Sequence, residues 1–113
     1  MSYSKGDIVI VPFPFTDLTT IKVRPAIVVS NDLVHRSGDV IIAQITSQSI
    51  RGPFAHQITN EDVTIPFKKG RDKMWVYCKK LVTVENRIIR KTVTKLKSPQ
   101  LGNVINKIKS AFD

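Results

Sequence analysis

Arg24 and Thr46 are the two side chains of this sequence whose types and positions suit the handling of a phosphate group. Arg24 precedes Pro25 at the start of one apolar run, Thr46 ends the next run, and both lie 11 residues from position 35. If the connection between the runs folds symmetrically, antiparallel pairing places both side chains at one edge of a sheet. A guanidinium can hold a phosphate through two parallel hydrogen bonds, and a threonine hydroxyl can donate a third. The alternative interpretation is a strand-edge Arg-Pro with a surface threonine.

The distribution of charge indicates a polyanionic partner. The chain of 113 residues has 18 Lys and Arg against 9 Asp and Glu, which gives a formal net charge of +9. Residues 1–67 carry 5 basic and 6 acidic side chains, whereas residues 68–113 carry 13 basic and 3 acidic ones. Such a field attracts polyanions, so nucleic acid or a very acidic protein is the expected partner. A basic surface that serves only solubility is the simpler alternative.

Other reactive side chains are few. His35 and His56 could form a paired acid and base near neutral pH, but they fall in a connection and in an alternating strand, which disfavours the pair. Cys78 is the single cysteine, so the chain can form neither an internal disulfide nor a Cys-based zinc site, and the two histidines lack metal-ligand spacing. We expect no metal and no cofactor, and we expect Cys78 to be a small buried apolar side chain.

Length and composition predict one soluble domain that spans residues 1–113. Hydrophobic residues make up 42% of the chain, and no apolar run approaches the roughly 18 to 20 residues that cross a bilayer. Residues 1–7 are polar and lack the apolar centre of a signal peptide, so we expect a cytoplasmic protein without membrane contact.

Short β-rich runs dominate the chain. They predict strands at residues 8–11, 26–29, 40–46, 56–59, 63–67, 75–84 and 88–96, with a loop at residues 12–20. Ser98 and Pro99 are typical of an N-cap and a first helical position, and they precede apolar residues at helical spacing: Leu101, Val104, Ile105, Ile108 and Phe112. The fold class is therefore mainly β, a twisted antiparallel sheet or small barrel with a C-terminal α-helix that closes one side.

Three segments resemble the MazF/PemK toxin family: residues 6–9 (Gly-Asp-Ile-Val), residues 23–32 around Arg24-Pro25, and residues 43–47, which include Thr46. Residues 75–84 also match the family pattern. The resemblance implies an SH3-like barrel of the CcdB/MazF type and a homodimer. It also implies a metal-independent endoribonuclease, an mRNA interferase, that cuts single-stranded RNA and is held inactive by an acidic antitoxin. The family's catalytic arginine and threonine fall on Arg24 and Thr46.

Residues near this pair and in the later basic segment are candidate RNA contacts. We assign RNA binding to Phe15, Thr16, Lys22, Ser47, Gln48, Lys79 and Lys80. Many relatives carry acidic or amide residues where this chain has Lys79 and Lys80, and lysine would instead grip phosphates or guanine acceptors. Some relatives also carry a glutamate where this chain has Thr19.

Aromatic residues leave two interpretations open. Trp75 and Tyr77 could stack on unpaired bases, but aromatic residues at alternate strand positions more often belong to a core. Phe13 and Phe15 present the same choice, and core packing or a dimer contact is favoured for them.

Cleavage without a metal can use the 2′-hydroxyl of RNA as the nucleophile and leave a 2′,3′-cyclic phosphate. Arginine stays protonated at pH 7 and is a poor base, so Arg24 is assigned to stabilising transition-state charge, with proton donation to the leaving oxygen as a further option. Thr46 positions the phosphate, and the general base is not identified.

Two other functions are weighed against the ribonuclease. A gyrase-poisoning toxin of the CcdB kind is disfavoured, because those relatives lack the Arg-Pro and threonine pair and end in Trp-Gly-Ile, whereas this chain ends in Ala-Phe-Asp. The second alternative is a basic barrel that binds nucleic acid without cutting it.

Overall fold

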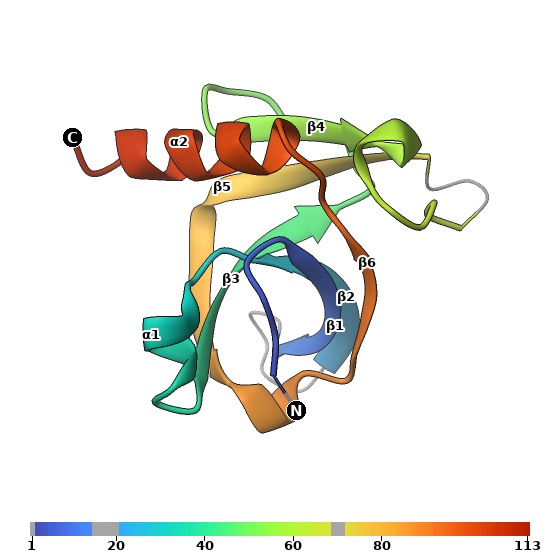
Figure 1. The fold of residues 1–113 in the computed structure, drawn as a ribbon. Helices are drawn as coiled ribbons and strands as arrows, with labels where there is room; N and C mark the ends of the chain where they lie inside the picture. The colour runs from blue at the N-terminus through green and yellow to red at the C-terminus, as the bar shows by residue number, and fades with distance from the viewer. Residues whose placement is uncertain (1, 15–20, 69–71) are drawn as a thin grey trace.

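The computed structural model describes residues 2–14, 21–68 and 72–113. Its strands form one curled antiparallel sheet in the order β4-β5-β3-β2-β1-β6, a half-barrel, and the C-terminal helix α2 lies along β4 and β5 (Figure 1). The elements are β1 (Asp7–Pro14), β2 (Ile21–Val28), α1 (Asp32–His35), β3 (Asp39–Thr46), β4 (Ala55–Thr59), β5 (Lys73–Glu85), β6 (Lys91–Lys95) and α2 (Gln100–Ser110). The predicted fold class is confirmed.

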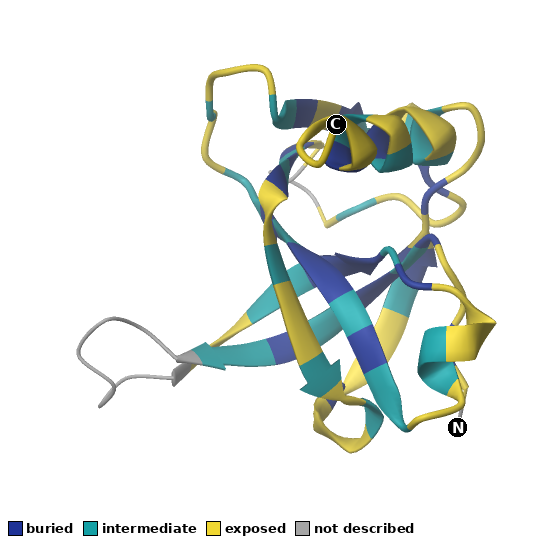
Figure 2. Ribbon diagram, turned by 90° about the vertical axis from the view of Figure 1, so that its left-hand side faces the viewer, coloured by how far each residue is buried: buried dark blue, intermediate teal, exposed yellow. Residues whose placement is uncertain are grey.

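Two apolar clusters lie on opposite faces of the sheet, because successive residues of a strand point to opposite sides. Ile8 and Ile27 belong to the cluster that β4, β5 and α2 cover. Val9 and Ala26 belong to the second cluster, which Tyr3 helps to close. Both faces of the central strands are therefore buried, which explains their consecutive apolar residues (Figure 2).

β5 changes direction halfway along its length (Figure 1). Its pairing with β3 runs from Glu85 to Leu81, opposite Ala43, and resumes at Val76, opposite Ile45. Between these pairs β3 advances by two residues and β5 by five, so residues 77–80 form an enlarged bulge. A bulge bends its strand and redirects side chains. β5 can therefore pair with β3 on both sides of the bend and with β4 beyond it.

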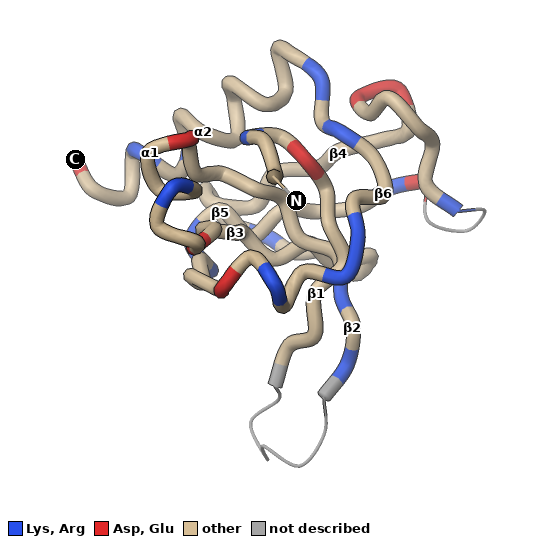
Figure 3. The backbone as a smooth tube through the Cα atoms, turned by 60° about the horizontal axis from the view of Figure 1, so that its bottom comes forward, with Lys and Arg blue, Asp and Glu red and all other residues tan. Residues whose placement is uncertain are grey.

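β1 and β2 are longer than the sequence predicts. Each contains proline, a residue that normally marks the end of a strand. The loop predicted from residue 12 is wrong for residues 12–14, which belong to β1. Pro12 and Pro14 come after Ile10, where the pairing of β1 with β6 ends, and Pro25 comes before Ala26, where the pairing of β2 with β3 begins. A strand tolerates a proline where the missing N–H faces no paired neighbour. The two strands thus continue as a two-stranded ribbon beyond the rest of the sheet (Figure 3).

The strand predicted at residues 63–67 is wrong. Val63 forms an isolated bridge with Leu96. Beyond it, side-chain oxygens accept the main-chain N–H groups that a neighbouring strand would otherwise pair. The Ile65 N–H donates to Thr94 Oγ1 at 2.8 Å, and the Phe67 N–H donates to Asn60 Oδ1 at 2.8 Å.

The remaining differences concern element ends. The connection after β2 contains a helix, α1, whose first N–H groups donate to the side chain of Asn31. β6 covers only Lys91–Lys95 of the predicted 88–96, because residues 86–88 form a 3₁₀ turn. α2 begins at Gln100, with Pro99 rather than Ser98 at the N-cap, and Phe112 lies past its end, exposed. No helix in the described ranges has the length and apolarity to span a membrane.

α2 is fixed to β4 near both of its ends. His56 Nε2 and Gln100 Oε1 lie 2.7 Å apart, and Lys107 Nζ donates to the Ala55 carbonyl at 3.1 Å. Val104, between these polar contacts, and Ile108, just after them, are buried in the first cluster. The predicted apolar face of the helix is therefore the face that docks.

Val104→Ala and Gly102→Ala should shift stability in opposite directions. Val104 is 0% exposed, so its truncation is expected to lower the free energy of unfolding by about 2 kcal/mol through lost burial and a cavity. A Cβ at Gly102 meets no heavy atom within 4 Å. Gly102→Ala is expected to raise that free energy by about 0.5–1 kcal/mol, because glycine inside a helix is costly. Urea unfolding followed by circular dichroism measures both values, and shifts of the same sign would contradict the docking of α2.

Candidate active site

Arg24 and Thr46 lie just past the end of the pairing between β2 and β3. That pairing consists of Ala26–Gln44, Ile27–Ala43 and Val28–Ile42. The same register, extended by two residues, would set Arg24 opposite Thr46, but neither residue is paired between β2 and β3. The two strands part at this point. Arg24 pairs with Val11 of β1, and Thr46 pairs with Trp75 of β5.

The two residues share one face of the sheet. Arg24 lies on the same face of β2 as Ala26 and Val28, and Thr46 lies on the same face of β3 as Ile42. Ala26, Val28 and Ile42 belong to the second apolar cluster. A row across that face therefore begins with Arg24 and Thr46. Trp75 lies opposite Thr46, and Gln57 of β4 lies opposite Trp75, so the row continues over four strands.

Thr46 is oriented by the turn that follows it. Its Oγ1 accepts a hydrogen bond from the Gln48 N–H at 3.1 Å. A hydroxyl that accepts in this way still has its own hydrogen to donate. Thr46 and Arg24 are both half-buried at the sheet margin, so part of each residue is accessible from solvent. Each of the two side chains can thus present hydrogen-bond donors at this margin of the sheet.

The candidate RNA contacts fall into three places. Lys22 is exposed on β2, on the same face as Arg24, and Figure 3 shows basic segments on this part of β2. Ser47 and Gln48 follow Thr46 directly. Lys79 and Lys80 are exposed in the bulge of β5.

Three residues singled out from the sequence, Phe15, Thr16 and Thr19, lie outside the described residues. Phe13 is half-buried and packs against the second apolar cluster, as core packing predicts. Trp75 and Tyr77 are half-buried rather than fully enclosed. The Lys80 ammonium lies 4.4 Å from the centroid of the Tyr77 ring, a cation–π contact.

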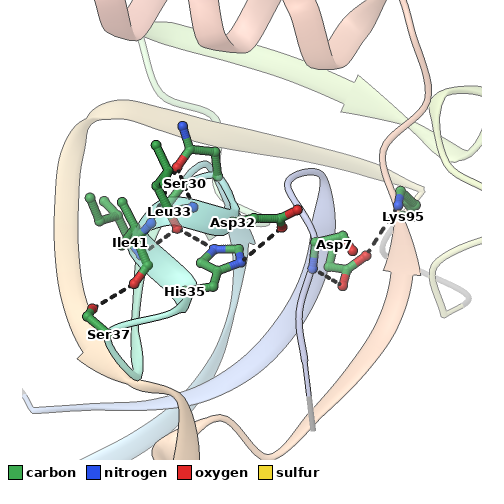
Figure 4. Close-up of polar contacts among 11 residues, drawn as sticks. Asp7, Ser30, Asp32, Leu33, His35, Ser37, Ile41 and Lys95 are labelled. Atoms are coloured by element: carbon green, nitrogen blue, oxygen red, sulfur yellow. Dashed lines mark hydrogen bonds and ion pairs between the residues drawn. The ribbon is translucent and has the colours of Figure 1, made fainter.

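The two histidines serve separate contacts and do not form an acid–base pair. His35 Nε2 lies 2.7 Å from Ser30 Oγ, which also accepts the Ile41 N–H at 2.9 Å (Figure 4). His35 Nδ1 lies 3.9 Å from an Asp32 carboxylate oxygen. This cluster ties α1 to β3, whereas His56 ties β4 to α2 through Gln100.

Cys78 is fully buried in the bulge of β5. Burial raises the pKa of its thiol, and the positive charge of Lys107 offsets part of that rise. The thiolate is the nucleophilic form of cysteine, so a raised pKa makes this thiol less reactive. The prediction of a small buried side chain is confirmed.

One hollow of the structure does not lie on the face of Arg24. A hollow of about 460 Å³ is lined by Ile10, Val23, Pro25, Met74 and the segment 65–68. Val23 and Pro25 alternate with Arg24, so their side chains point to the opposite face. A second hollow of about 200 Å³ is lined by residues 50–55, Tyr77, Lys79 and Lys80.

Gln57 and Arg51 are candidates that sequence patterns do not find. Gln57 enters the row only through the pairing of β4 with β5, and Arg51 reaches the second hollow through the turn after β3. The one available signal is the alternation of Gln57 with the buried residues His56 and Ile58, which marks its outward direction.

Comparison with known proteins gives one family. Residues 4–112 match the family model described as PemK-like, MazF-like toxin of type II toxin–antitoxin system. No curated protein sequence matches the chain.

Solved structures share the fold at low sequence identity. A MazE–MazF crystal structure from Deinococcus radiodurans matches with a TM-score of 0.77 and 18% identity, covering 99% of this chain and 97% of that one. An endoribonuclease in complex with its cognate antitoxin from a mycobacterial species gives a TM-score of 0.74 and 16% identity, covering 98% and 95%. The Mycobacterium tuberculosis toxin MazF-mt6 gives a TM-score of 0.71 and 18% identity, covering 95% and 96%.

Cys78 should react slowly with Ellman's reagent in the folded protein. Because its pKa is raised, the thiolate fraction at pH 8 is smaller than that of a free cysteine, and it increases only at higher pH. We expect the reaction to be at least about tenfold slower than in the same chain unfolded in urea. Equal rates in the two states would contradict the burial of the thiol.

Proposed function

The chain belongs to the PemK-like, MazF-like toxin family of type II toxin–antitoxin systems, and on that premise we propose that it is a metal-independent, sequence-specific endoribonuclease acting on single-stranded RNA. The observation that carries the proposal is the register of β2 and β3, which, extended by two residues past its last pair, would set Arg24 opposite Thr46 on one face. The mycobacterial structure of the same fold is named an endoribonuclease, which supports this activity.

The proposed reaction is an internal transfer of the phosphoryl group. The 2′-oxygen attacks the neighbouring phosphorus, the bond from phosphorus to the 5′-oxygen breaks, and the products carry a 2′,3′-cyclic phosphate and a 5′-hydroxyl. Negative charge builds on the phosphoryl oxygens during the attack. Arg24 supplies a positive charge and paired N–H donors to these oxygens, and Thr46 donates its hydroxyl hydrogen to the same group.

Two protons must also move. One leaves the 2′-hydroxyl, and one reaches the departing 5′-oxygen. Arg24 is suited to the second transfer, because a guanidinium has protons to give and no lone pair that accepts one. A separate group takes the first proton.

Charge favours RNA as the substrate and an acidic protein as the inhibitor. The net charge of +9 attracts both polyanions, and they compete for the same basic surface. The structures named as MazE–MazF and as a toxin with its cognate antitoxin support an antitoxin partner. The proposal includes a homodimer that works in the cytoplasm, where its substrate is found.

Arg24→Ala is expected to reduce the rate of RNA cleavage by about a hundredfold or more, because one charged donor to the transition state is lost. Arg24→Lys should recover only part of the rate, since lysine keeps the charge but not the two parallel hydrogen bonds. Thr46→Ser should retain more activity than Thr46→Val, because only serine retains the hydroxyl. Single-turnover cleavage of a long single-stranded RNA in chelator measures these rates, and circular dichroism checks folding. Cleavage by Arg24→Ala at the wild-type rate would refute its assignment.

A single 2′-deoxynucleotide on the 5′ side of the scissile phosphate should stop cleavage. The substitution removes the proposed nucleophile and leaves the phosphate that Arg24 and Thr46 contact. End mapping of the unmodified RNA should show 2′,3′-cyclic phosphate termini, with or without chelator. A deoxy-substituted RNA that is still cut at the same bond would exclude this mechanism.

A further inference from the structure

The hollow of about 200 Å³ beside the bulge of β5 combines aromatic and cationic side chains. Phe54 and Tyr77 supply aromatic surface, and Arg51, Lys79 and Lys80 supply positive charge. The volume is smaller than the pockets that hold drug-sized ligands and suits a single planar ring system.

The walls of the hollow are fixed by main-chain hydrogen bonds. The Cys78 N–H donates to the Phe54 carbonyl at 2.8 Å, which ties the bulge to the turn before β4. The Ala55 N–H donates to the Gly52 carbonyl at 3.2 Å and closes that turn, where Gly52 has a φ of +110°. The hollow is therefore preformed and does not depend on side-chain contacts alone.

The hollow lies next to the candidate catalytic pair. Tyr77 is two residues past Trp75 on β5 and shares its face, and Trp75 lies opposite Thr46. Two residues along a strand span about 7 Å, a distance comparable to the step between neighbouring nucleotides of an extended strand. Residues 50 and 51 also follow Thr46 closely in the chain. A base beside a phosphate held by Thr46 can thus reach the hollow.

The cations around the hollow are available to a ligand. Arg51, Lys79 and Lys80 are exposed, and none of them forms an ion pair with a carboxylate in the described part of the chain. The Lys80 ammonium covers the Tyr77 ring, and such contacts are weak at exposed sites. A base can take the place of the ammonium on the ring, and the flexible lysine can then reach the edge of that base.

We propose that this hollow binds one unstacked guanine of the RNA, next to the scissile phosphate. The inference rests on the proposed ribonuclease function and adds its base preference. Arginine and lysine only donate hydrogen bonds, and guanine presents two adjacent acceptors, O6 and N7, on one edge. Tyr77 supplies the stacking surface that a base needs once it leaves its neighbours.

Nucleotide binding tests the hollow without cleavage. Titration of the ¹⁵N-labelled protein with guanosine 5′-monophosphate should shift amide signals of residues 51–55 and 77–80. Adenosine, cytidine and uridine monophosphates and the 7-deaza analogue, which lacks N7, should bind at least about fivefold more weakly. Equal shifts with all of these nucleotides would mean that only the phosphate is bound, and would overturn the proposal.

Two substitutions separate stacking from general charge. Tyr77→Leu should weaken guanosine monophosphate binding by about tenfold or more, and Tyr77→Phe, which keeps the ring, should restore it. Arg51→Ala should remove the difference between guanosine and 7-deazaguanosine monophosphates. Lys109→Ala, an exposed charge on α2, is the control and should leave that difference intact. If Tyr77→Leu binds as tightly as wild type, the hollow is not the base site.

Cleavage mapping gives an independent result. Cut sites of the wild-type protein on a long RNA should share a guanine beside the broken bond, and Arg51→Ala should relax that requirement while cutting continues. If the wild type cuts without a guanine preference, the base site is refuted and the ribonuclease function stands. If the wild type does not cut at all, the function fails, and the nucleotide titration still decides the base site.

Discussion

The point at which β2 stops pairing with β3 determines what this sheet can present to a phosphate. Pro25 comes directly before Ala26, the first residue of β2 that pairs with β3, and it has no N–H to offer a neighbouring strand. On its other side β2 keeps its pairing with β1, so the strand does not fray when it leaves β3. Arg24 is therefore held in a fixed register by β1 and is at the same time released from β3.

Thr46 is held by the strand on the other side of the gap, β5. β3 leaves β2 and remains paired with β5, where Trp75 lies opposite Thr46. The two candidate residues are thus supported by different neighbours, β1 and β5, and share only their register and face. Backbone pairing fixes positions more firmly than a loop does, which favours a site that must align donors with one phosphate. The hydrogen bond from the Gln48 N–H further restricts the Thr46 hydroxyl.

Local patterns in the sequence predict some of this arrangement and miss the rest for physical reasons. Equal spacing about position 35 predicts the register of β2 and β3, since an antiparallel pair is symmetric about its connection. It does not predict where the pairing ends, because that depends on how β1 and β5 hold the outer edges of the two strands. The bulge at residues 77–80 is likewise not predicted, since strand-forming residues flank Lys79 and Lys80 on both sides in the run 75–84. The alternation at residues 63–67 misleads because the N–H groups of Ile65 and Phe67 donate to the side chains of Thr94 and Asn60 rather than to a neighbouring strand.

The bulge also provides exposed positions that can be substituted without disturbing the core. Val76 and Cys78 are fully buried and anchor β5 on either side of Tyr77, whereas Lys79 and Lys80 face solvent. Because residues 77–80 have no one-to-one partners on β3, substitutions at the exposed positions disturb no strand register. Arg24 and Thr46, in contrast, depend on that register for their alignment. The fold thus separates the proposed catalytic residues, which depend on the register of β2 and β3, from the exposed lysines of the proposed base site, which do not.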